Sequence, residues 1–219
     1  LMHGWGMTEM SPLGTATVKT KEMEDMDIEA RYDLQQRQGK AFFGVEMTIA
    51  DDDGNELPQD GVAFGRLLVK GPTIVDTYFK SNDSAKDENG WFDTGDVAKI
   101  HPEGYMEIVD RSKDVIKSGG EWISSIDLEN AAVGHPGVAE ACVIGVLHAK
   151  WDERPLLLIV KATNEDPSKE DILKYLEDKV AKWWLPDDIV FVEELPHTAT
   201  GKLLKTGLRE DYKSHLINK

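Results

Sequence analysis

The pattern of apolar residues changes near Arg111, and this change constrains the fold more than any other feature of the chain. Before it, short alternating runs are separated by turn residues, which is typical of antiparallel strands. After it, continuous apolar runs of strand length alternate with segments of helical periodicity. We therefore expect a mixed α/β fold with two units. A mostly β unit covers residues 1–110, and a small α/β unit covers residues 111–219.

Strands in the first unit are predicted from alternation and turn signals. Residues 45–49 alternate as a half-buried strand does, and the turn residues 52–55 follow directly. Residues 64–69 are predicted as another strand. Residues 97–100 and 105–109 are predicted as a hairpin. The first unit should therefore consist mainly of strands and turns.

Capping signals and apolar runs define the second unit. Ser124 and Asp127 have capping-box spacing and predict a helix that ends near residues 135–137. Ser168 is predicted to cap a second helix, and a terminal helix is expected from about Thr206. Buried strands are expected at 138–146, 156–160 and 189–192. The second helix should bury an apolar face made of Ile172, Leu173, Leu176, Val180 and Trp183.

Composition excludes several classes of function. The formal net charge is −16, which argues against a nucleic-acid partner but leaves room for a small phosphorylated ligand. The single cysteine, Cys142, lies in an apolar run and is interpreted as a structural thiol. No histidine has metal-ligand spacing, and no apolar stretch or signal peptide predicts a membrane span or export. We expect a cytoplasmic protein. Because the chain begins abruptly at Leu1, we also expect it to be a segment of a longer one.

The first candidate for chemistry runs from Gly4 to Glu9. Glycines on both sides of Trp5 would let the backbone approach a planar ligand on which the indole could stack. Thr8 and Glu9 offer a hydroxyl for phosphate and a carboxylate for Mg²⁺. A plain glycine turn beside a core tryptophan explains the same residues, and both interpretations stay open.

Two further segments carry charge and glycine. Asp96 follows Thr94-Gly95 and is placed on a tight turn before the hairpin, where a carboxylate could accept hydrogen bonds from a ribose diol or cap the turn. Residues 110–122 cross the boundary between the units. They could form a hinge with a ligand-facing glycine loop, or a solvated linker.

The fourth segment is the polar loop 196–205, which holds Lys202 just before the terminal helix. A flexible loop can deliver one ammonium to a phosphate, although a lone lysine is usually a surface residue. The loop lacks the spacing of a Walker A motif. His197 is interpreted as a residue that packs the loop and not as a base.

Taken together and in order, these segments resemble the motif series of the adenylate-forming superfamily, which includes acyl-CoA synthetases, peptide-synthetase adenylation domains and beetle luciferases. The resemblance covers essentially the whole chain. The motifs are Trp5-Gly6-Met7-Thr8-Glu9, Thr94-Gly95-Asp96, Asp110-Arg111-Ser112-Lys113-Asp114 and Gly201-Lys202. Met7 to Pro12, Gly14-Thr15 and Trp183 to Asp187 resemble the medium- and long-chain fatty acyl-CoA ligases and the neighbouring methylthiopropionate-CoA ligases.

The resemblance implies a role for each matching residue. Lys202, Thr8 and Glu9 would act in catalysis, with Glu9 holding Mg²⁺. Lys113 would be the hinge at which the second unit rotates. The nucleotide and CoA would be bound by Gly4, Trp5, Gly6, Met7, Asp96, Arg111, Lys117, Gly119, Gly120 and Trp122.

The implied substrates are ATP, CoA and a carboxylic acid, expected to be a fatty acid. An acyl-adenylate would form first, and the CoA thiol would then displace AMP. The family's phosphate-binding loop has no counterpart here, since it precedes these motifs, so residues 1–110 would be the end of a larger domain. We expect the chain to be inactive alone. An adenylation module that loads a carrier-protein thiol, or a non-catalytic nucleotide- or CoA-binding module, are the alternatives.

Overall fold

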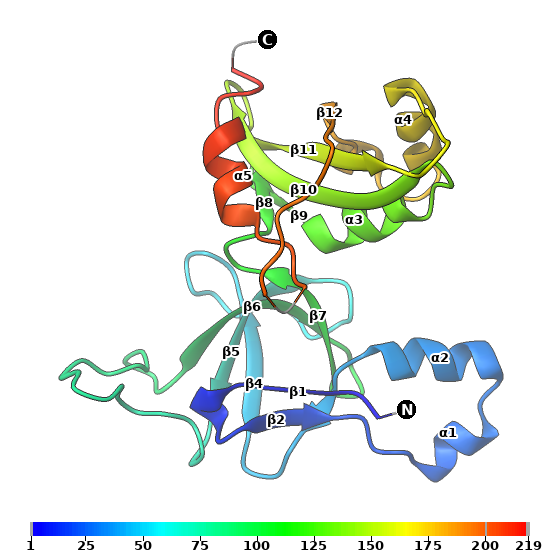
Figure 1. Ribbon diagram of the computed structural model, residues 1–219. Helices are drawn as coiled ribbons and strands as arrows, with labels where there is room; N and C mark the ends of the chain where they lie inside the picture. The colour runs from blue at the N-terminus through cyan, green and yellow to red at the C-terminus, as the bar shows by residue number, and fades with distance from the viewer. Residues whose placement is uncertain (1, 200, 218–219) are drawn as a thin grey trace. The chain divides into compact units, whose positions relative to one another are not determined.

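The computed structural model describes residues 2–199 and 201–217 (Figure 1). The chain divides into two compact units between Ser112 and Lys113. Each unit contains strands and helices, so the expected mixed α/β fold is confirmed. In the described residues, no helix is long and apolar enough to cross a bilayer.

An antiparallel sheet of seven strands forms the first unit, in the order β1-β2-β3-β7-β6-β5-β4 (Figure 1). Its strands are β1 (Gly4–Gly6), β2 (Leu13–Ala16), β3 (Gly39–Ala41), β4 (Glu46–Ala50), β5 (Phe64–Lys70), β6 (Phe92–Ile100) and β7 (Tyr105–Arg111). The predicted strands correspond to β4, β5, β6 and β7. On β5, buried and half-buried residues alternate, as expected for a strand with one face on a core.

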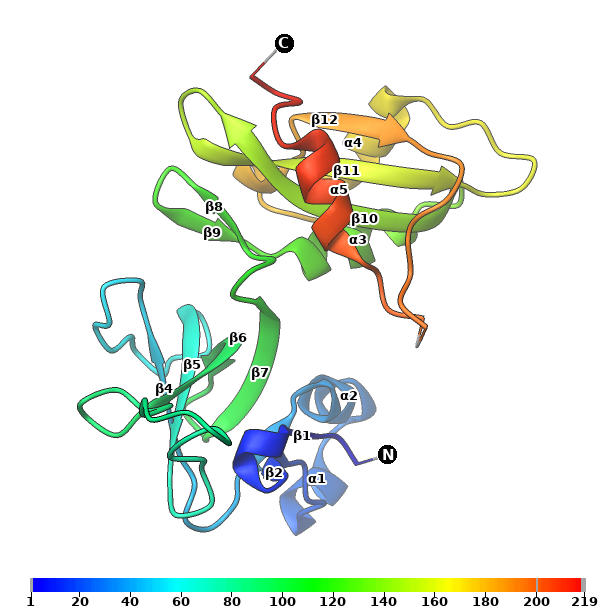
Figure 2. The same ribbon diagram turned by 60° about the vertical axis from the view of Figure 1, so that its left-hand side comes forward.

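Two helices in the first unit were not expected from the sequence. They are α1 (Lys21–Asp25), capped by Thr20, and α2 (Ile28–Gln36), capped by Asp27. Figures 1 and 2 both place them together beside β1 and β2. The sequence gives little signal for α2 because that helix buries none of its residues, so it has no apolar stripe.

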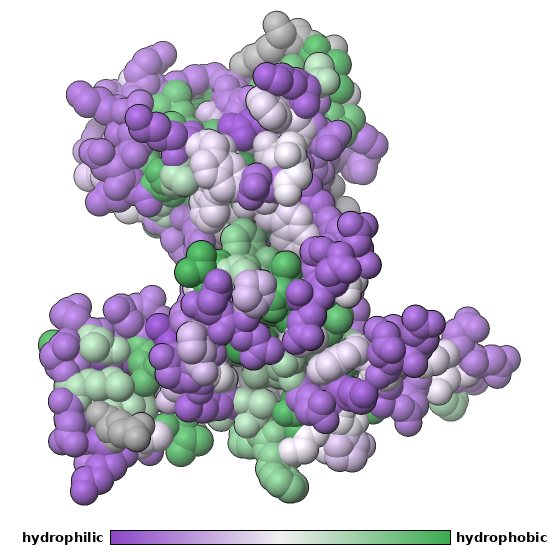
Figure 3. Space-filling model, turned by 180° about the vertical axis from the view of Figure 1, so that it is seen from behind, coloured by the Kyte–Doolittle hydropathy of each residue, from purple (hydrophilic) through white to green (hydrophobic). Residues whose placement is uncertain are grey.

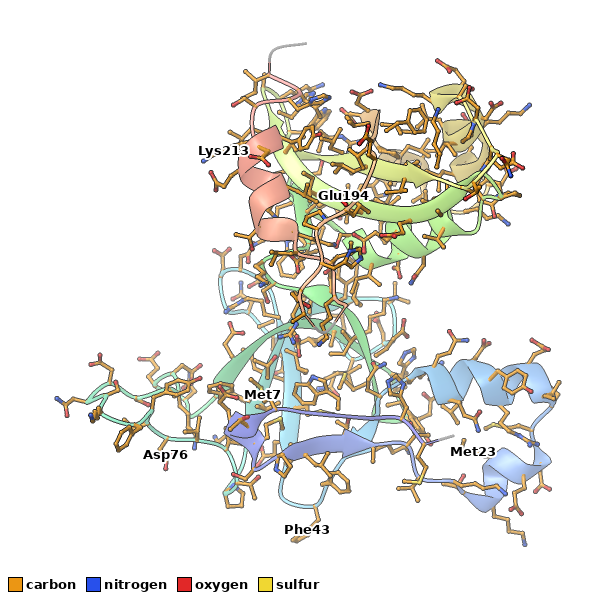
Figure 4. All side chains as sticks on the ribbon, viewed as in Figure 1. Met7, Met23, Phe43, Asp76, Glu194 and Lys213 are labelled. Atoms are coloured by element: carbon orange, nitrogen blue, oxygen red, sulfur yellow. The ribbon has the colours of Figure 1, made fainter. Side chains whose placement is uncertain are left out.

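Loops of the first unit carry apolar side chains into solvent. Phe43, between β3 and β4, is fully exposed at 108% and points away from the sheet (Figure 4). Figure 3 shows hydrophobic residues gathered at this lower end of the unit. The connection from β5 to β6 carries Asp76 (Figure 4) and the exposed Phe79. This connection reaches out from the sheet in Figure 1.

The second unit is a five-stranded sheet with helices on both faces (Figure 2). The strands are β8 (Ile116–Ser118), β9 (Glu121–Ile123), β10 (Val138–His148), β11 (Asp152–Lys161) and β12 (Asp188–Phe191). The helices of this unit are α3 (Ser125–Val133), α4 (Lys169–Glu177) and α5 (Lys205–Tyr212). Each unit also has a short 3-10 turn, η1 (Thr8–Met10) in the first and η2 (Lys182–Trp184) in the second.

Alternation along β10 and β11 divides the apolar residues of the second unit between two cores. One core joins Val143 and Leu157 to α3 and α4, and the other joins Cys142 and Leu158 to α5. Successive strand residues point to opposite faces, so neighbouring positions supply different cores. The burial predicted for Cys142 is confirmed. Burial, with the charge of Glu129, raises the pKa of this thiol to about 12.

The helix caps match the sequence prediction more closely than the helix ends. Ser124 and Ser168 both cap helices, and Ser168 forms a full capping box with Asp171. The prediction placed Val180 and Trp183 on the second helix, but α4 ends at Glu177. Val180 still packs on the core beyond the helix end, whereas Trp183 lies in η2 and is 43% exposed.

Candidate functional site

Three motif residues that are distant in sequence meet in the first unit. The Trp5 indole N–H donates to Asp96 Oδ2 at 2.8 Å, and Arg111 Nη1 lies 2.8 Å from Asp96 Oδ1. Arg111 is the cross-strand partner of Asp96, which brings it to the same place by register. We call Trp5, Asp96 and Arg111 the Asp96 cluster. These residues come from the motifs expected to bind adenine, to bind ribose and to form the hinge, and all three lie in the first unit.

Asp96 lies inside β6 and not on the tight turn that the sequence suggested. The turn signal came from Gly95, whose φ of +71° favours glycine. This residue instead breaks the regular course of the strand, and its carbonyl accepts the Ser112 N–H at 3.0 Å. Thr94 fixes the segment further, because its hydroxyl donates to the Leu67 carbonyl at 2.8 Å and accepts the Asp96 N–H at 3.1 Å.

The Asp96 carboxylate is nearly enclosed, with 6% of its side chain exposed. Desolvation raises the pKa of Asp96 above its usual value, although the Trp5 hydrogen bond and the Arg111 charge oppose that shift. The Arg111 side chain is 56% exposed. From the described residues, each oxygen of the Asp96 carboxylate has one donor, and a carboxylate oxygen can accept a second hydrogen bond. The cluster is therefore a preorganised acceptor with a cation at its edge.

The Trp5 ring is half-buried and packs on the core of the first unit. A methyl group on Gly14 would lie 2.6 Å from Trp5 Cζ3, so Gly14 lies directly against the ring. Gly6 has a similar packing reason, since an added Cβ would lie 2.1 Å from the Pro12 carbonyl oxygen. Trp5 therefore packs as a core tryptophan would, and its indole N–H also donates to Asp96.

Among the other residues of the first motif, Gly4 lies in β1, and Met7, Thr8 and Glu9 lie on or beside the 3-10 turn η1. Thr8 and Gly4 are exposed, while Met7 packs against the core at the start of η1 (Figure 4). The Tyr78 hydroxyl donates to Glu9 Oε1 at 3.1 Å. Mg²⁺ in nucleotide sites takes one or two carboxylates with substrate phosphates as further ligands, and a single half-buried Glu9 suits that mode. Among the described residues, no cluster of three acidic, histidine or cysteine side chains could form a full metal cage.

The predicted glycine loop in the second unit is the turn of the β8–β9 hairpin. Gly119 and Gly120 both have positive φ, +59° and +89°, as a two-residue hairpin turn requires. Lys117 and Trp122 are cross-strand partners, and Lys117 Nζ lies 5.0 Å from the centre of the Trp122 ring. The hairpin therefore places its glycines at the tip and this cation–π pair at its base.

A pocket beside this hairpin was not predicted from the sequence. It has a volume of about 450 Å³ and is lined by Ser118, Gly119, Glu121, Trp151, Arg154 and Trp183. Trp151 and Trp183 are 41% and 43% exposed, which is unusual for two tryptophans on one surface. We call this the tryptophan pocket. Gly119 is packed under Trp151, because an added Cβ would lie 2.7 Å from its ring.

Arg154 holds the tryptophan pocket together. Its guanidinium donates to Asp187 Oδ1 at 2.6 Å, to the Trp183 and Leu185 carbonyls at 2.8 and 3.0 Å, and to Ser118 Oγ at 3.1 Å. These bonds tie β8 to the turn that carries Trp183. The Arg154 side chain is 13% exposed, and most of its N–H donors are already used. Arg154 therefore stabilises the wall of the pocket.

Lys202 lies in the second unit on a small hairpin-like loop. The Thr198 N–H donates to the Lys202 carbonyl at 2.8 Å, and the Leu204 N–H donates to the Pro196 carbonyl at 2.8 Å. The Lys202 side chain is exposed, and in the described part of the chain no carboxylate lies within ion-pair distance of it. His197 contacts the Leu195 carbonyl at 2.8 Å, in agreement with a packing role. Lys113 is the exposed first residue of the second unit.

Comparison with known proteins gives matches along most of the chain. Residues 1–79 match the AMP-binding enzyme family, and residues 127–202 match the AMP-binding enzyme C-terminal domain. The chain is 55% identical over 215 residues to the 3-methylmercaptopropionyl-CoA ligase of Ruegeria lacuscaerulensis, covering 98% of this chain and 40% of that protein. It is 46% identical over 217 residues to the medium-chain-fatty-acid–CoA ligase of Ectopseudomonas oleovorans, with 99% and 40% covered.

A solved structure gives a similar result. The ATP-bound MatB from Rhodopseudomonas palustris matches with a TM-score of 0.80 and 30% identity, over 99% of this chain and 41% of that one. The chain thus spans about 40% of the length of the curated relatives it matches.

Proposed function

Because this chain belongs to the AMP-binding, adenylate-forming enzyme family, we propose that it is the C-terminal part of an ATP-dependent acyl-CoA ligase. The convergence of three motifs on the buried Asp96 carboxylate carries this proposal. The complete ligase would join a carboxylic acid to AMP, release pyrophosphate, and then transfer the acyl group to the CoA thiol. The 219-residue chain alone would catalyse neither step.

The Asp96 cluster is proposed to hold the nucleoside of ATP. A ribose diol would donate to the acceptor positions still open on Asp96, and the exposed Arg111 guanidinium would stand at the phosphate side. Trp5 is packed on its core side, so it would offer its remaining surface to adenine. Met7 and the glycines Gly4 and Gly6 would shape the backbone beside the ring.

The first chemical step would place negative charge on the α-phosphate. Lys202 is proposed to bring its ammonium to those oxygens, and Thr8 would donate its hydroxyl to a phosphate. Glu9 would hold Mg²⁺, which supplies charge neutralisation when bound. A positioned donor of this kind contributes about 3–4 kcal/mol to transition-state stabilisation. Rotation at Lys113 would then exchange Lys202 for the glycine hairpin.

The second step requires CoA to reach the acyl-adenylate. Gly119 and Gly120 present no side chain that would block a pantetheine arm, and Lys117 carries a charge suited to phosphate. The tryptophan pocket adjoins Gly119, and its two exposed indoles suit a planar ring such as the adenine of CoA. We assign Trp151 and Trp183 to this role together with Trp122.

The test uses the complete ligase that carries this chain, with ATP, Mg²⁺ and CoA. The acids are 3-methylmercaptopropionate, a medium-chain and a long-chain fatty acid. We expect acid-dependent AMP release and thioester formation with at least one of them. Transfer to a carrier-protein thiol but not to CoA would favour the carrier-loading alternative. Tight binding of an acyl-adenylate without turnover would overturn the proposal in favour of a non-catalytic binding module.

A further inference from the structure

Lys205, three residues beyond Lys202, is a largely enclosed lysine that none of the expected roles uses. It is the first residue of α5, and its side chain is 10% exposed. Its ammonium lies 2.6 Å from Glu129 Oε1 and donates to Ser125 Oγ at 2.7 Å. Enclosing a charged ammonium is unfavourable unless it is paired, so this position needs its partners. We call these three residues the Lys205 clamp.

The clamp connects three elements of the second unit. Glu129 and Ser125 belong to α3, and Lys205 begins α5. Glu129 Oε1 also accepts the Val143 N–H at 2.8 Å, which ties the clamp to the middle of β10. The Glu129 side chain is 14% exposed, so its charge is shielded from water as well. One end of the Lys202 loop is thus fastened to the core by an ion pair.

The other contacts of the loop explain why that fastening matters. Leu195, at the loop's beginning, is buried in the core under α5, and Leu203 packs against that core. Between these anchors the loop is held by its own backbone hydrogen bonds, including Thr198 N–H to the Lys202 carbonyl. Figure 4 shows Glu194 where the chain leaves β12 to enter this loop. Releasing Lys205 would leave apolar packing, from Leu203 and from Leu208 in α5, to hold the chain just after Lys202.

We propose that Lys205 and Glu129 are positioning residues that hold the Lys202 loop in its conformation. This inference rests on the proposed function only in that Lys202 is the group being positioned. Neither residue would touch substrate. The clamp would act through the geometry of the loop and would matter for adenylation, which uses Lys202. It would matter little for thioester formation, which does not.

The direct test is amide hydrogen exchange in the 219-residue chain, followed by NMR. In Lys205→Met, we expect the Thr198 and Leu204 amides to exchange at least about tenfold faster, because their loop opens more often. Lys205→Arg keeps a cation and should restore most of the protection. Lys174→Met, on the exposed face of α4, is the matched control and should change nothing.

A second variant, Glu129→Gln, distinguishes a local effect on the loop from general unfolding. It keeps an acceptor for the Val143 N–H while removing the ion pair. With β10 and β11 amides still protected, faster exchange in the loop supports the clamp. Unchanged loop exchange in both Lys205→Met and Glu129→Gln would overturn it.

Activity in the complete ligase adds a second readout. We expect Lys205→Met to lower acid-dependent ATP–pyrophosphate exchange by at least about tenfold. Thioester formation from a preformed acyl-adenylate should be kept. Equal losses in both half-reactions would contradict a positioning role. Should Lys202→Ala keep full exchange activity, the proposed function fails, whereas the hydrogen-exchange result on the loop stands independently.

Discussion

Replacing Trp5 with phenylalanine tests the Asp96 cluster through stability alone. The change removes the indole N–H that donates to Asp96 Oδ2 at 2.8 Å and leaves a small space beside Gly14. A hydrogen bond to a charged group contributes about 1.5–3 kcal/mol. The smaller ring loses about 1 kcal/mol more in packing. We therefore expect the first unit to lose about 2.5–4 kcal/mol of its free energy of unfolding at neutral pH.

The loss should depend on pH, with a sign fixed by Asp96. Burial already raises the pKa of Asp96, so ionising this carboxyl destabilises the folded state as pH rises through the folded pKa. Trp5→Phe removes a hydrogen bond that opposes the shift, which raises the pKa of Asp96 further. The loss of stability is therefore largest at neutral pH, where Asp96 is ionised. It shrinks toward acidic pH, because Asp96 takes up a proton as the pH falls through its raised folded pKa.

The assay is urea unfolding at neutral and at acidic pH, followed through the NMR signals of residues 97–100 in β6. Trp91→Phe is the matched control, since Trp91 is also half-buried in the first unit. Lys70 Nζ lies 5.7 Å from the centre of the Trp91 ring. The control should show a smaller loss without the pH dependence. A loss below about 0.5 kcal/mol for Trp5→Phe, or an equal loss at both pH values, would refute this reasoning.

Three further predictions concern packing and reactivity. Gly14→Ala would place a Cβ 2.5 Å from Met10 Cε and 2.6 Å from Trp5 Cζ3, and should destabilise the first unit by about 1–3 kcal/mol in urea unfolding. Gly207→Ala, in α5 with open space around it, should stabilise the second unit by about 0.5–1 kcal/mol in calorimetry; destabilisation would contradict this. Cys142, with its pKa raised to about 12, should resist a thiol reagent at pH 8 until urea unfolds the chain, and rapid labelling of the native protein would contradict its burial.

Local signals in the sequence were the most reliable guide to the fold. Ser124 and Ser168 cap helices as predicted, because a cap depends only on residues three positions apart. The strands from β4 to β7 followed from alternation for a similar reason. The α1–α2 pair could not be predicted in this way, since α2 buries none of its residues and is held by its caps and its surroundings.

The site depended on contacts that local pattern does not encode. Trp5 and Asp96 are 91 positions apart, on β1 and β6, and three other strands separate these two in the order of the sheet. The motif resemblance selected both residues but said nothing of their contact. The tryptophan pocket shows a further limit. Trp151 and Trp183 line one pocket whose wall is held by the hydrogen bonds of Arg154, and no spacing in the sequence indicates that arrangement.

The most direct test of the central claim is Lys202→Ala in the complete ligase that carries this chain. Acid-dependent pyrophosphate release and thioester formation from a preformed acyl-adenylate are measured separately. We predict that pyrophosphate release falls by about 10²–10³-fold, because a fixed cation at the α-phosphate is lost. Thioester formation should be largely kept. Normal pyrophosphate release in the variant would contradict the assignment of Lys202 and, with it, the chemistry proposed for this chain.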